Sequence, residues 1–197
     1  ARETVDAAGI WTYTATALTE GGHIFSTVVE DQAGNQSPPS TAINFTVDTV
    51  LPDAATGTLN DDVTPVTGSI TNDSTTNDTT PIFSGTAEVG STVIIYDGST
   101  ELARETVDAA GIWTYTATAL TEGGHIFSTV VEDFAGNQSL ASSAINFTVD
   151  TVLPDAATGT LNDDVTPVTG SIINSSTTND TTPIFSGTAE ARSTVII

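Results

Sequence analysis

Short segments in which apolar and polar residues alternate recur along the chain, separated by Gly, Pro, Asn, Asp and Ser. Side chains two positions apart on a β-strand share a face, so this alternation predicts strands with one buried side. The clearest case is the strand in which Trp113, Tyr115 and Ala117 would point inward. No window has a helical period, and the chain is therefore predicted to be all-β.

Between Asp53 and Val149 the pattern predicts seven strands, each rich in Thr, Val, Ile or aromatic residues. The predicted strands are 54–59, 81–87, 92–96, 101–107, 112–119, 125–131 and 143–149. Their inner face would also include Phe83, Val93, Ile95, Phe127, Thr129, Val131, Ile145, Phe147 and Val149. Seven short antiparallel strands in about 100 residues are typical of an immunoglobulin-like β-sandwich, here without a Cys pair between the sheets. An odd strand number places the chain's points of entrance and departure at opposite ends of the domain.

The connections support this arrangement. Asp97-Gly98, Ala110-Gly111 and Gly123-Gly124 precede predicted strands and supply residues that tolerate a positive φ. The segment 60–80 is much longer than a hairpin connection. We therefore expect it to be functional or partly structured, with an extra strand within 63–70.

The chain is a tandem repeat, because residues 1–95 return at 103–197 with only eight differences. A repeat of this length suits a domain that folds alone and is arranged in an array, rather than a solenoid unit. We divide the chain into the last four strands of one domain (1–52), a complete domain with its linker (53–154) and the first three strands of the next (155–197). The linkers 48–53 and 150–155 each contain Pro, which predicts stiff joints.

The two terminal parts are complementary halves of one sandwich, and together they lack only a second copy of residues 96–102. Neither half could bury its own inner face, and each would expose sheet edges. We expect that the sequence belongs to a longer array, or that the tail of one chain completes the head of the next, head to tail, in an open filament. The expected partners are thus neighbouring identical repeats.

Composition narrows the class of function. The chain has 25 acidic residues against three Arg and no Lys, and its formal net charge is -22. Nucleic acid and anionic membrane surfaces would be repelled, so neither is an expected partner, and no stretch is long and apolar enough for membrane insertion. High charge also characterises disordered chains, but the 38% hydrophobic content and its clustering favour a packed core.

Clusters of Asn and Asp suggest calcium, which binds six to eight oxygen atoms from carboxylates, amides, backbone carbonyls and water. The simpler interpretation is that these residues form turns by bonding their own backbone, but the number of clusters favours Ca²⁺. Strand topology would bring carboxylates of two domains together at every joint. The candidate ligands are Asp48, Asp53, Asn60, Asp61, Asp62, Asn77, Asp78, Glu88, Glu132, Asp133, Asn137, Asp150, Asp155, Asn162, Asp163, Asp164 and Asp180.

An ordered set of motifs resembles a known family. DTTPIFSGTAE at 78–88, GSTV at 90–93, GIW at 111–113, GH at 124–125 and DFAGNQS at 133–139 are similar to the bacterial Ig-like repeats of giant, biofilm-associated surface adhesins. The resemblance implies a seven-stranded sandwich at the extracellular surface of a bacterium, with calcium at or near the joints. It also implies that the repeats are extenders that project a distal adhesive domain. The second copy departs from the motifs at Arg192, which replaces Gly90. Ser175 replaces Asp73 of the Asn72-Asp73 pair, so Asp73 is not expected to be an obligatory ligand.

An enzyme is not predicted. His23 and His125 each follow a Gly-Gly pair at the start of a strand, with no hydrolase motif nearby, and half-buried strand histidines are expected there. One His per repeat and no Cys also disfavour zinc. Two other functions stay open. A module that binds a glycan or protein directly would need an exposed aromatic platform, for which Phe134 is a candidate. An accessory domain of a secreted hydrolase would need a catalytic domain elsewhere.

Overall fold

The structure, a computed structural model, describes residues 1–197 and contains β-strands without helices. It divides into two compact units, residues 1–150 and 151–197. The strands are β1 (Gly21–Phe25), β2 (Ile43–Val47), β3 (Thr58–Asp61), β4 (Gly68–Ile70), β5 (Ser74–Thr76), β6 (Ile82–Thr86), β7 (Thr92–Asp97), β8 (Thr100–Thr106), β9 (Ile112–Thr116), β10 (Gly123–Glu132), β11 (Ile145–Val149), β12 (Thr160–Asp163), β13 (Gly170–Ile172) and β14 (Ile184–Ser186).

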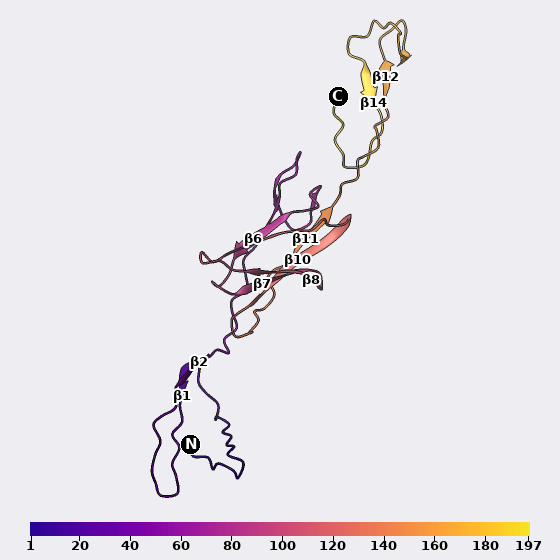
Figure 1. Ribbon diagram of the computed structural model, residues 1–197. Helices are drawn as coiled ribbons and strands as arrows, with labels where there is room; N and C mark the ends of the chain where they lie inside the picture. Colours follow the sequence, from indigo (N-terminus) through magenta and orange to yellow (C-terminus); the bar gives the residue numbers. More distant parts are fainter. The chain divides into compact units, whose positions relative to one another are not determined.

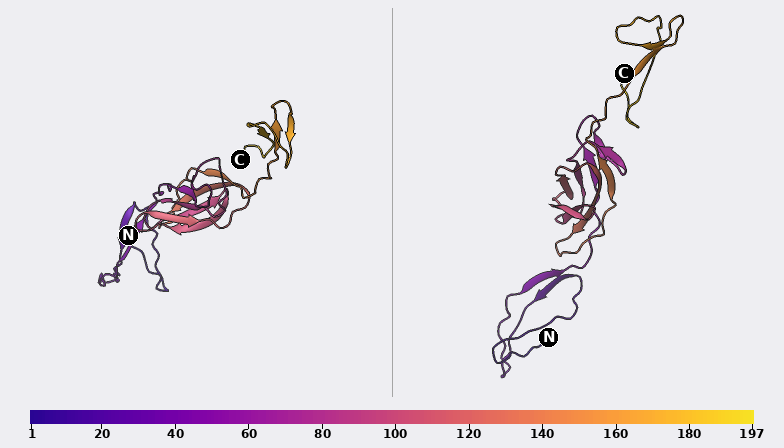
Figure 2. Two further views of the ribbon diagram at one scale, coloured as in Figure 1. Left: turned by 90° about the horizontal axis from the view of Figure 1, so that it is seen from above. Right: turned by 90° about the vertical axis from the view of Figure 1, so that its right-hand side faces the viewer.

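The complete domain is a sandwich of two sheets, with β3 to β11 in its two layers (Figures 1 and 2). One sheet has the order β4-β3-β6-β9 and the other β5-β11-β10-β7-β8. All neighbouring strands are antiparallel except β5 and β11, which are parallel. The predicted all-β, immunoglobulin-like sandwich is thus confirmed.

The number and bounds of the strands differ from those predicted. The first strand was predicted at 54–59 but forms at Thr58–Asp61, because Leu59 fixes its register opposite Phe83 and Ile70. Residues 112–119 and 143–149 form shorter strands than predicted, whereas β10 is longer than 125–131 and includes the Gly pair predicted to precede it.

The predicted long loop contains two short strands, so the domain has nine strands and not seven. Of the predicted extra strand 63–70 only Gly68–Ile70 pairs, because Pro65 has no backbone N–H and Val66 is exposed. Strand β5 was not predicted, since Ser74-Thr75-Thr76 has no apolar alternation. It forms by adding to the edge of β11, next to which the Asn72 side chain bonds the Asn146 backbone and amide.

The core lies between the two sheets, as the alternation predicted. Trp113, Tyr115 and Ala117 are buried on β9 and the segment after it, and Phe127 and Val131 are buried on β10. Aromatic rings meet edge to face, with centroids 4.9 Å apart for Phe83 and Trp113 and 5.2 Å apart for Phe127 and Phe147. Such aromatic pairs add to the free energy gained from burial alone. Ile145 was predicted to be inward and is half-buried at the margin.

The chain enters and leaves this domain at opposite ends of β10. At the first residue of β10, Gly123 lies opposite Val149, the last residue of β11. At the other end, Glu132 leads into the loop 133–137, where the Asn137 side chain donates a hydrogen bond to the Asp48 carbonyl in the preceding linker. The predicted placement of the two ends is therefore confirmed.

Candidate functional site

Two buried carboxylates organise the segment between β3 and β6. Asp61 is 5% exposed and Asp78 is fully buried. The Thr76 hydroxyl lies between them: it donates to Asp61 Oδ2 at 2.5 Å and accepts from the Asp78 backbone N–H at 3.0 Å. We call Asp61, Thr76 and Asp78 the acid bridge. It ties the ends of a long connection to β5.

Backbone groups satisfy the remaining oxygens of the acid bridge. Asp61 Oδ1 accepts from the Val63 N–H at 2.8 Å, and Asp78 Oδ1 accepts from the Thr80 N–H at 2.7 Å. Asp78 Oδ2 accepts a longer bond, 3.4 Å, from the Asp62 N–H. Hydrogen bonds of this kind stabilise a buried carboxylate, which is otherwise costly away from water. Neither acid forms an ion pair with a cation of the protein, so the dipoles of its hydrogen-bond donors balance its charge.

The same arrangement recurs in residues 151–197. Asp163 and Asp180 are buried, and the Thr178 hydroxyl donates to Asp163 Oδ2 and accepts from the Asp180 N–H. The Asp164 N–H again contacts Asp180 Oδ2. This unit has only three strands, β12 to β14. The acid bridge is therefore a property of its own segment and does not require the second sheet.

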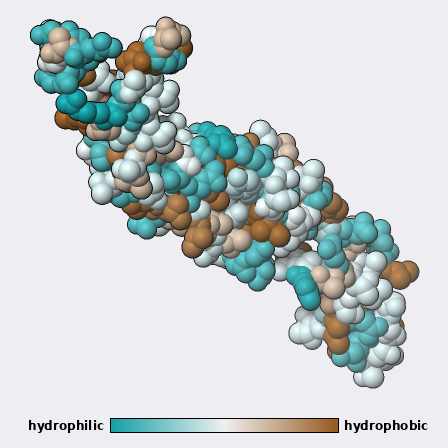
Figure 3. Space-filling view, turned by 90° about the horizontal axis from the view of Figure 1, so that it is seen from below, coloured by the Kyte–Doolittle hydropathy of each residue, from teal (hydrophilic) through white to brown (hydrophobic).

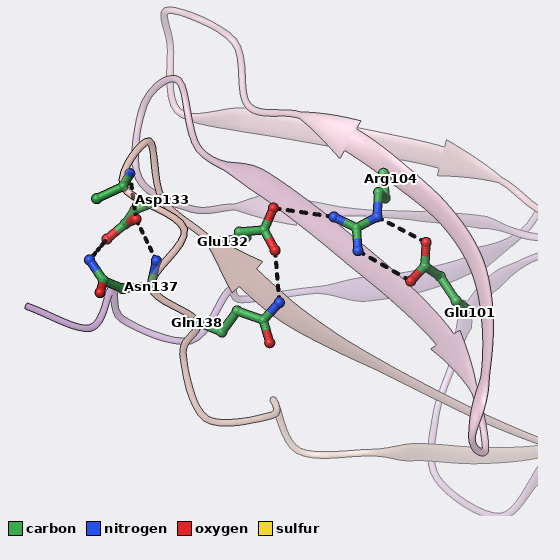
Figure 4. Close-up of polar contacts among 7 residues, drawn as sticks. Glu101, Arg104, Glu132, Asp133, Asn137 and Gln138 are labelled. Carbon is green, nitrogen blue, oxygen red and sulfur yellow. Dashed lines mark hydrogen bonds and ion pairs between the residues drawn. The ribbon is translucent and has the colours of Figure 1, made fainter. Parts of the chain in front are cut away.

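A second group of predicted residues lies in the loop after β10 (Figure 4). Asp133 accepts three hydrogen bonds at 2.8 Å, from the Ala135 N–H, the Asn137 N–H and the Asn137 side chain. The side-chain bond from Asn137 is the main cause that lowers the pKa of Asp133, and the backbone bonds add to it against partial desolvation. Both Asp133 oxygens thus hold the shape of the loop that contacts the linker.

Glu132 has a different set of partners, on the outer surface of the five-stranded sheet. Arg104 donates to Glu132 at 3.2 Å and to Glu101 at 2.9 Å, and Gln138 donates to Glu132 at 2.7 Å (Figure 4). These groups are largely exposed, and exposed ion pairs contribute little to stability. Arg104 and Gln138 thus occupy oxygens of Glu132, and a role for Glu132 as a cation ligand stays a prediction.

The remaining candidate ligands are more scattered. Asn60 and Asn77 donate to the carbonyls of Asp61 and Thr64, and Asn162 donates to the carbonyl of Asp163. Asp53, Glu88 and Asp155 are exposed. The Asp150 N–H bonds the Thr76 carbonyl at 2.9 Å, which brings that linker to the acid bridge.

A hard cation prefers carboxylate oxygens as ligands, and the acid bridge contains such oxygens, each of which accepts a hydrogen bond. The number of these oxygens is smaller than the six to eight that Ca²⁺ binds. In the described chain no group of three or more His, Cys, Asp or Glu side chains could hold a metal ion. Calcium binding stays a prediction.

Sequence reasoning missed the polar contacts of His125. Its Nδ1 lies 2.6 Å from Asp97 Oδ2 and its Nε2 lies 2.9 Å from the Thr121 carbonyl, and the ring is buried rather than half-buried. Burial lowers the pKa of His125, but the Thr121 carbonyl and the Asp97 carboxylate together outweigh it and raise that pKa. The sequence predicted only that Asp97 lies in a turn. No pattern in the sequence indicated that this turn contacts β10.

The paired sheets, the buried aromatic core and the backbone-bonded acids define an immunoglobulin-like β-sandwich domain. Comparison with protein families agrees: the profile of the bacterial Ig-like domain matches residues 2–49 and 54–151. The chain belongs to this family, whose members are typically extracellular or exposed at the cell surface.

Other comparisons add little. A search of curated proteins found no match. Among solved structures, CopC from Methylosinus trichosporium OB3b is 17% identical, with a TM-score of 0.28, and the match covers 47% of this chain and 93% of CopC. No helix in the structure is long and apolar enough to cross a lipid bilayer.

Proposed function

We propose that the chain is an extender segment of a bacterial cell-surface adhesin, whose repeats hold an adhesive domain away from the cell and support adhesion or biofilm formation. The observation that carries this proposal is that the chain enters and leaves the complete domain at opposite ends of β10. A strand of ten residues spans about 33 Å, so each repeat joined in this way adds length.

Calcium at the joints is the second part of the proposal. The acid bridge lies beside the departing linker, because the Thr76 carbonyl accepts from the Asp150 N–H. With a formal net charge of -22 and no Lys, the chain has few cations of its own to balance such groups. A bound Ca²⁺ would neutralise the acid bridge and fix the linker, which would stiffen the joint.

Thermal unfolding of the full chain in Ca²⁺ and in a chelator tests the calcium proposal. An ion that binds only the folded state stabilises it by about 2.7 kcal/mol when its concentration is 100 times its Kd. Mg²⁺ and NaCl at matched ionic strength control for charge screening. The double variant Asp61→Asn/Asp78→Asn should lose the response of the complete domain and leave only that of the second acid bridge at Asp163 and Asp180. Asp73→Ser should keep the whole response, because the other repeat already has Ser175 there. An unchanged melting temperature in all conditions would refute calcium binding.

The extender role is tested separately by small-angle scattering on arrays of increasing repeat number. The maximum dimension should grow by a constant increment with each repeat, and a compact array would contradict the proposal. Direct recognition of a glycan or protein is the alternative. Its best aromatic candidate, Phe134, is 93% exposed but is Gln32 in the other copy, so repeats would differ in binding.

A further inference from the structure

The linker before the complete domain forms hydrogen bonds with both of the repeats that it joins. The Thr49 N–H donates to Glu20 Oε1 at 3.1 Å, just before β1, and the Thr49 hydroxyl donates to the same carboxylate. One residue earlier, the Asp48 carbonyl accepts from the Asn137 side chain at 3.1 Å. Two successive linker residues are therefore held by different repeats, Thr49 by the preceding one and Asp48 by the following one.

Apolar packing does not hold this linker. Val50 and Leu51 are 64% and 58% exposed. On the face of the molecule drawn in Figure 3, apolar residues lie scattered among hydrophilic ones. A further local bond joins the Val50 N–H to Asp48 Oδ1 at 3.1 Å. The linker is therefore fixed by polar contacts, of which those with Glu20 and Asn137 reach outside it.

Asn137 belongs to a turn that is closed by its own hydrogen bonds. We call residues 133–137 the linker turn. Besides the bonds to the Asp133 carboxylate, the Asp133 N–H donates to the Asn137 carbonyl at 3.0 Å. Gly136 has a φ of 87°, which favours glycine. The same bonds close residues 31–35 in the other copy, where Gln32 replaces Phe134. The shape of the turn is thus set locally and does not require the aromatic ring.

Contacts with the sandwich fix the position of the linker turn. After the turn, the Ser139 N–H donates to the Val131 carbonyl and the Val131 N–H donates to the Ser139 hydroxyl, both at 2.9 Å. On the other side, the Phe134 ring lies against Gly90, where an added Cβ would be 3.0 Å from the ring. Because Val131 is fully buried, the turn is attached directly to the core.

Asp133 determines which way the Asn137 amide points. The Asn137 side chain donates to Asp133 Oδ2 at 2.8 Å (Figure 4). An ionised carboxylate only accepts hydrogen bonds, so the NH₂ group of the amide and not its oxygen must face Asp133. The NH₂ group has two hydrogens, and the second one serves the Asp48 carbonyl. The linker turn therefore presents a donor of fixed direction to the linker.

We propose that the linker turn is a binding site for the backbone of the preceding linker, and that Asn137 and Glu20 together fix the joint between repeats without a bound ion. The inference rests on the proposed extender role, since a fixed joint matters where repeats are joined in series. The site is separate from the acid bridge, which lies beside the following linker at Asp150.

The sequence repeats both parts of this contact. The turn reads DQAGN at 31–35 and DFAGN at 133–137, and the linker reads DTVLPD at 48–53 and at 150–155. The bound group is a backbone carbonyl, so the turn recognises the path of the linker and not its side chains. Each linker of an array would thus be held at one end by the acid bridge of one repeat and at the other by the linker turn of the next.

Nuclear magnetic resonance relaxation of the full chain tests the proposal, in a chelator that removes divalent ions. The heteronuclear NOE of the Thr49 and Val50 amides should be as high as that of the amides of β10. Asn137→Asp replaces the donor by a carboxylate that repels Asp133 and the Asp48 carbonyl, so both NOE values should fall to those of a flexible chain. Asn35→Asp makes the same change in the other copy of the turn and should leave both values unchanged.

Two further variants keep the test decisive. The resonances of β7 and β10 show whether Asn137→Asp stays folded, and Asn137→Ala, which removes the donors without adding charge, replaces it if it does not. Glu20→Ala lies outside the complete domain and should lower the NOE of Thr49. A linker that is flexible in the parent chain, or that loosens equally in Asn35→Asp, overturns the proposal.

The same measurement separates this proposal from the extender role. A rigid linker in arrays that do not lengthen with repeat number would refute the extender role and leave the linker turn as the binding site. Arrays that lengthen while the linker amides are flexible would refute the role of the linker turn alone.

Discussion

His125 and Asp97 lie 2.6 Å apart, joined across the ends of β10 and β7. The other ring nitrogen faces the Thr121 carbonyl, and both partners accept hydrogen bonds. Both nitrogens therefore donate at once only when the imidazole carries two protons. The charged form of His125 is the form that this site stabilises, in agreement with its raised pKa.

The pH dependence of stability follows from this pair. A raised pKa in the folded state gives stability that is fully present below the unfolded pKa, about 6.5, and is lost as pH rises through the folded pKa. Denaturant unfolding should show this loss as pH rises above about 6.5, with Trp113 as the reporter in a Trp11→Phe background. Asp97→Asn should flatten the dependence. If the free energy of unfolding of Asp97→Asn changed with pH as steeply as that of the parent chain, the pair of His125 and Asp97 would not be the cause of the pH dependence.

Gly85 should not tolerate a side chain. A Cβ atom at this position would lie 1.9 Å from the Thr56 carbonyl oxygen, because the segment before β3 runs close alongside β6, where the Thr56 N–H bonds the Thr86 carbonyl. We expect Gly85→Ala to lower the free energy of unfolding by about 1–3 kcal/mol or more through backbone displacement. Gly124→Ala is the control, since a Cβ there meets no atom within 4 Å. Equal losses in chemical denaturation would contradict the close approach as the cause.

Two substitutions at Trp113 separate the contribution of ring volume to stability from the contribution of the buried indole N–H. Trp113→Ala should cost about 3–5 kcal/mol, because it leaves a cavity beside Phe83. Trp113→Phe should cost less, since the indole N–H is buried without a hydrogen-bond partner and its loss removes an unsatisfied donor. Calorimetric melting of both variants measures the difference. Identical losses would mean that ring volume contributes little.

The acid bridge should depend on one hydroxyl. Thr76→Val keeps the shape of the side chain but removes the donor to Asp61 and the acceptor for the Asp78 N–H. Leaving such groups unpaired should lower the free energy of unfolding by about 1–3 kcal/mol. Thr75→Val, exposed on the same strand, should change stability by less than about 0.5 kcal/mol. If urea unfolding showed the same free energy of unfolding for Thr76→Val and the parent chain, the role assigned to the hydroxyl would be wrong.

Strict alternation made most of the inner face predictable, because burial on one side of a strand leaves a period of two in the sequence. The same rule placed Ile94 on the outer face, yet it is fully buried between its ladder neighbours Arg104 and Val130. Strand β5 was missed because its pairing with β11 is decided by tertiary contact, not by local pattern.

The residue types of the candidate site could be predicted from the sequence, but the contacts between their side chains could not. Asp61 and Asp78 stand out as acids in a long connection, but sequence alone does not reveal that Thr76 lies between them. Asp133 and Asn137 have a spacing typical of a self-bonded turn, and the structure shows that turn. Whether either group also holds calcium depends on ligands and geometry that residue types do not specify.

The chain enters and leaves the complete domain at opposite ends, and this arrangement has a mechanical consequence. A pull on the linkers at residues 53 and 150 loads β3 and β11 from opposite ends of the domain, and each strand is held by a ladder, β3 with β6 and β11 with β10. Force in that direction slides strands past one another and loads their hydrogen bonds together, instead of opening them one by one. The domain should therefore resist stretching more than its modest size suggests, as single-molecule pulling through these linkers would reveal against pulling across β7 and β8.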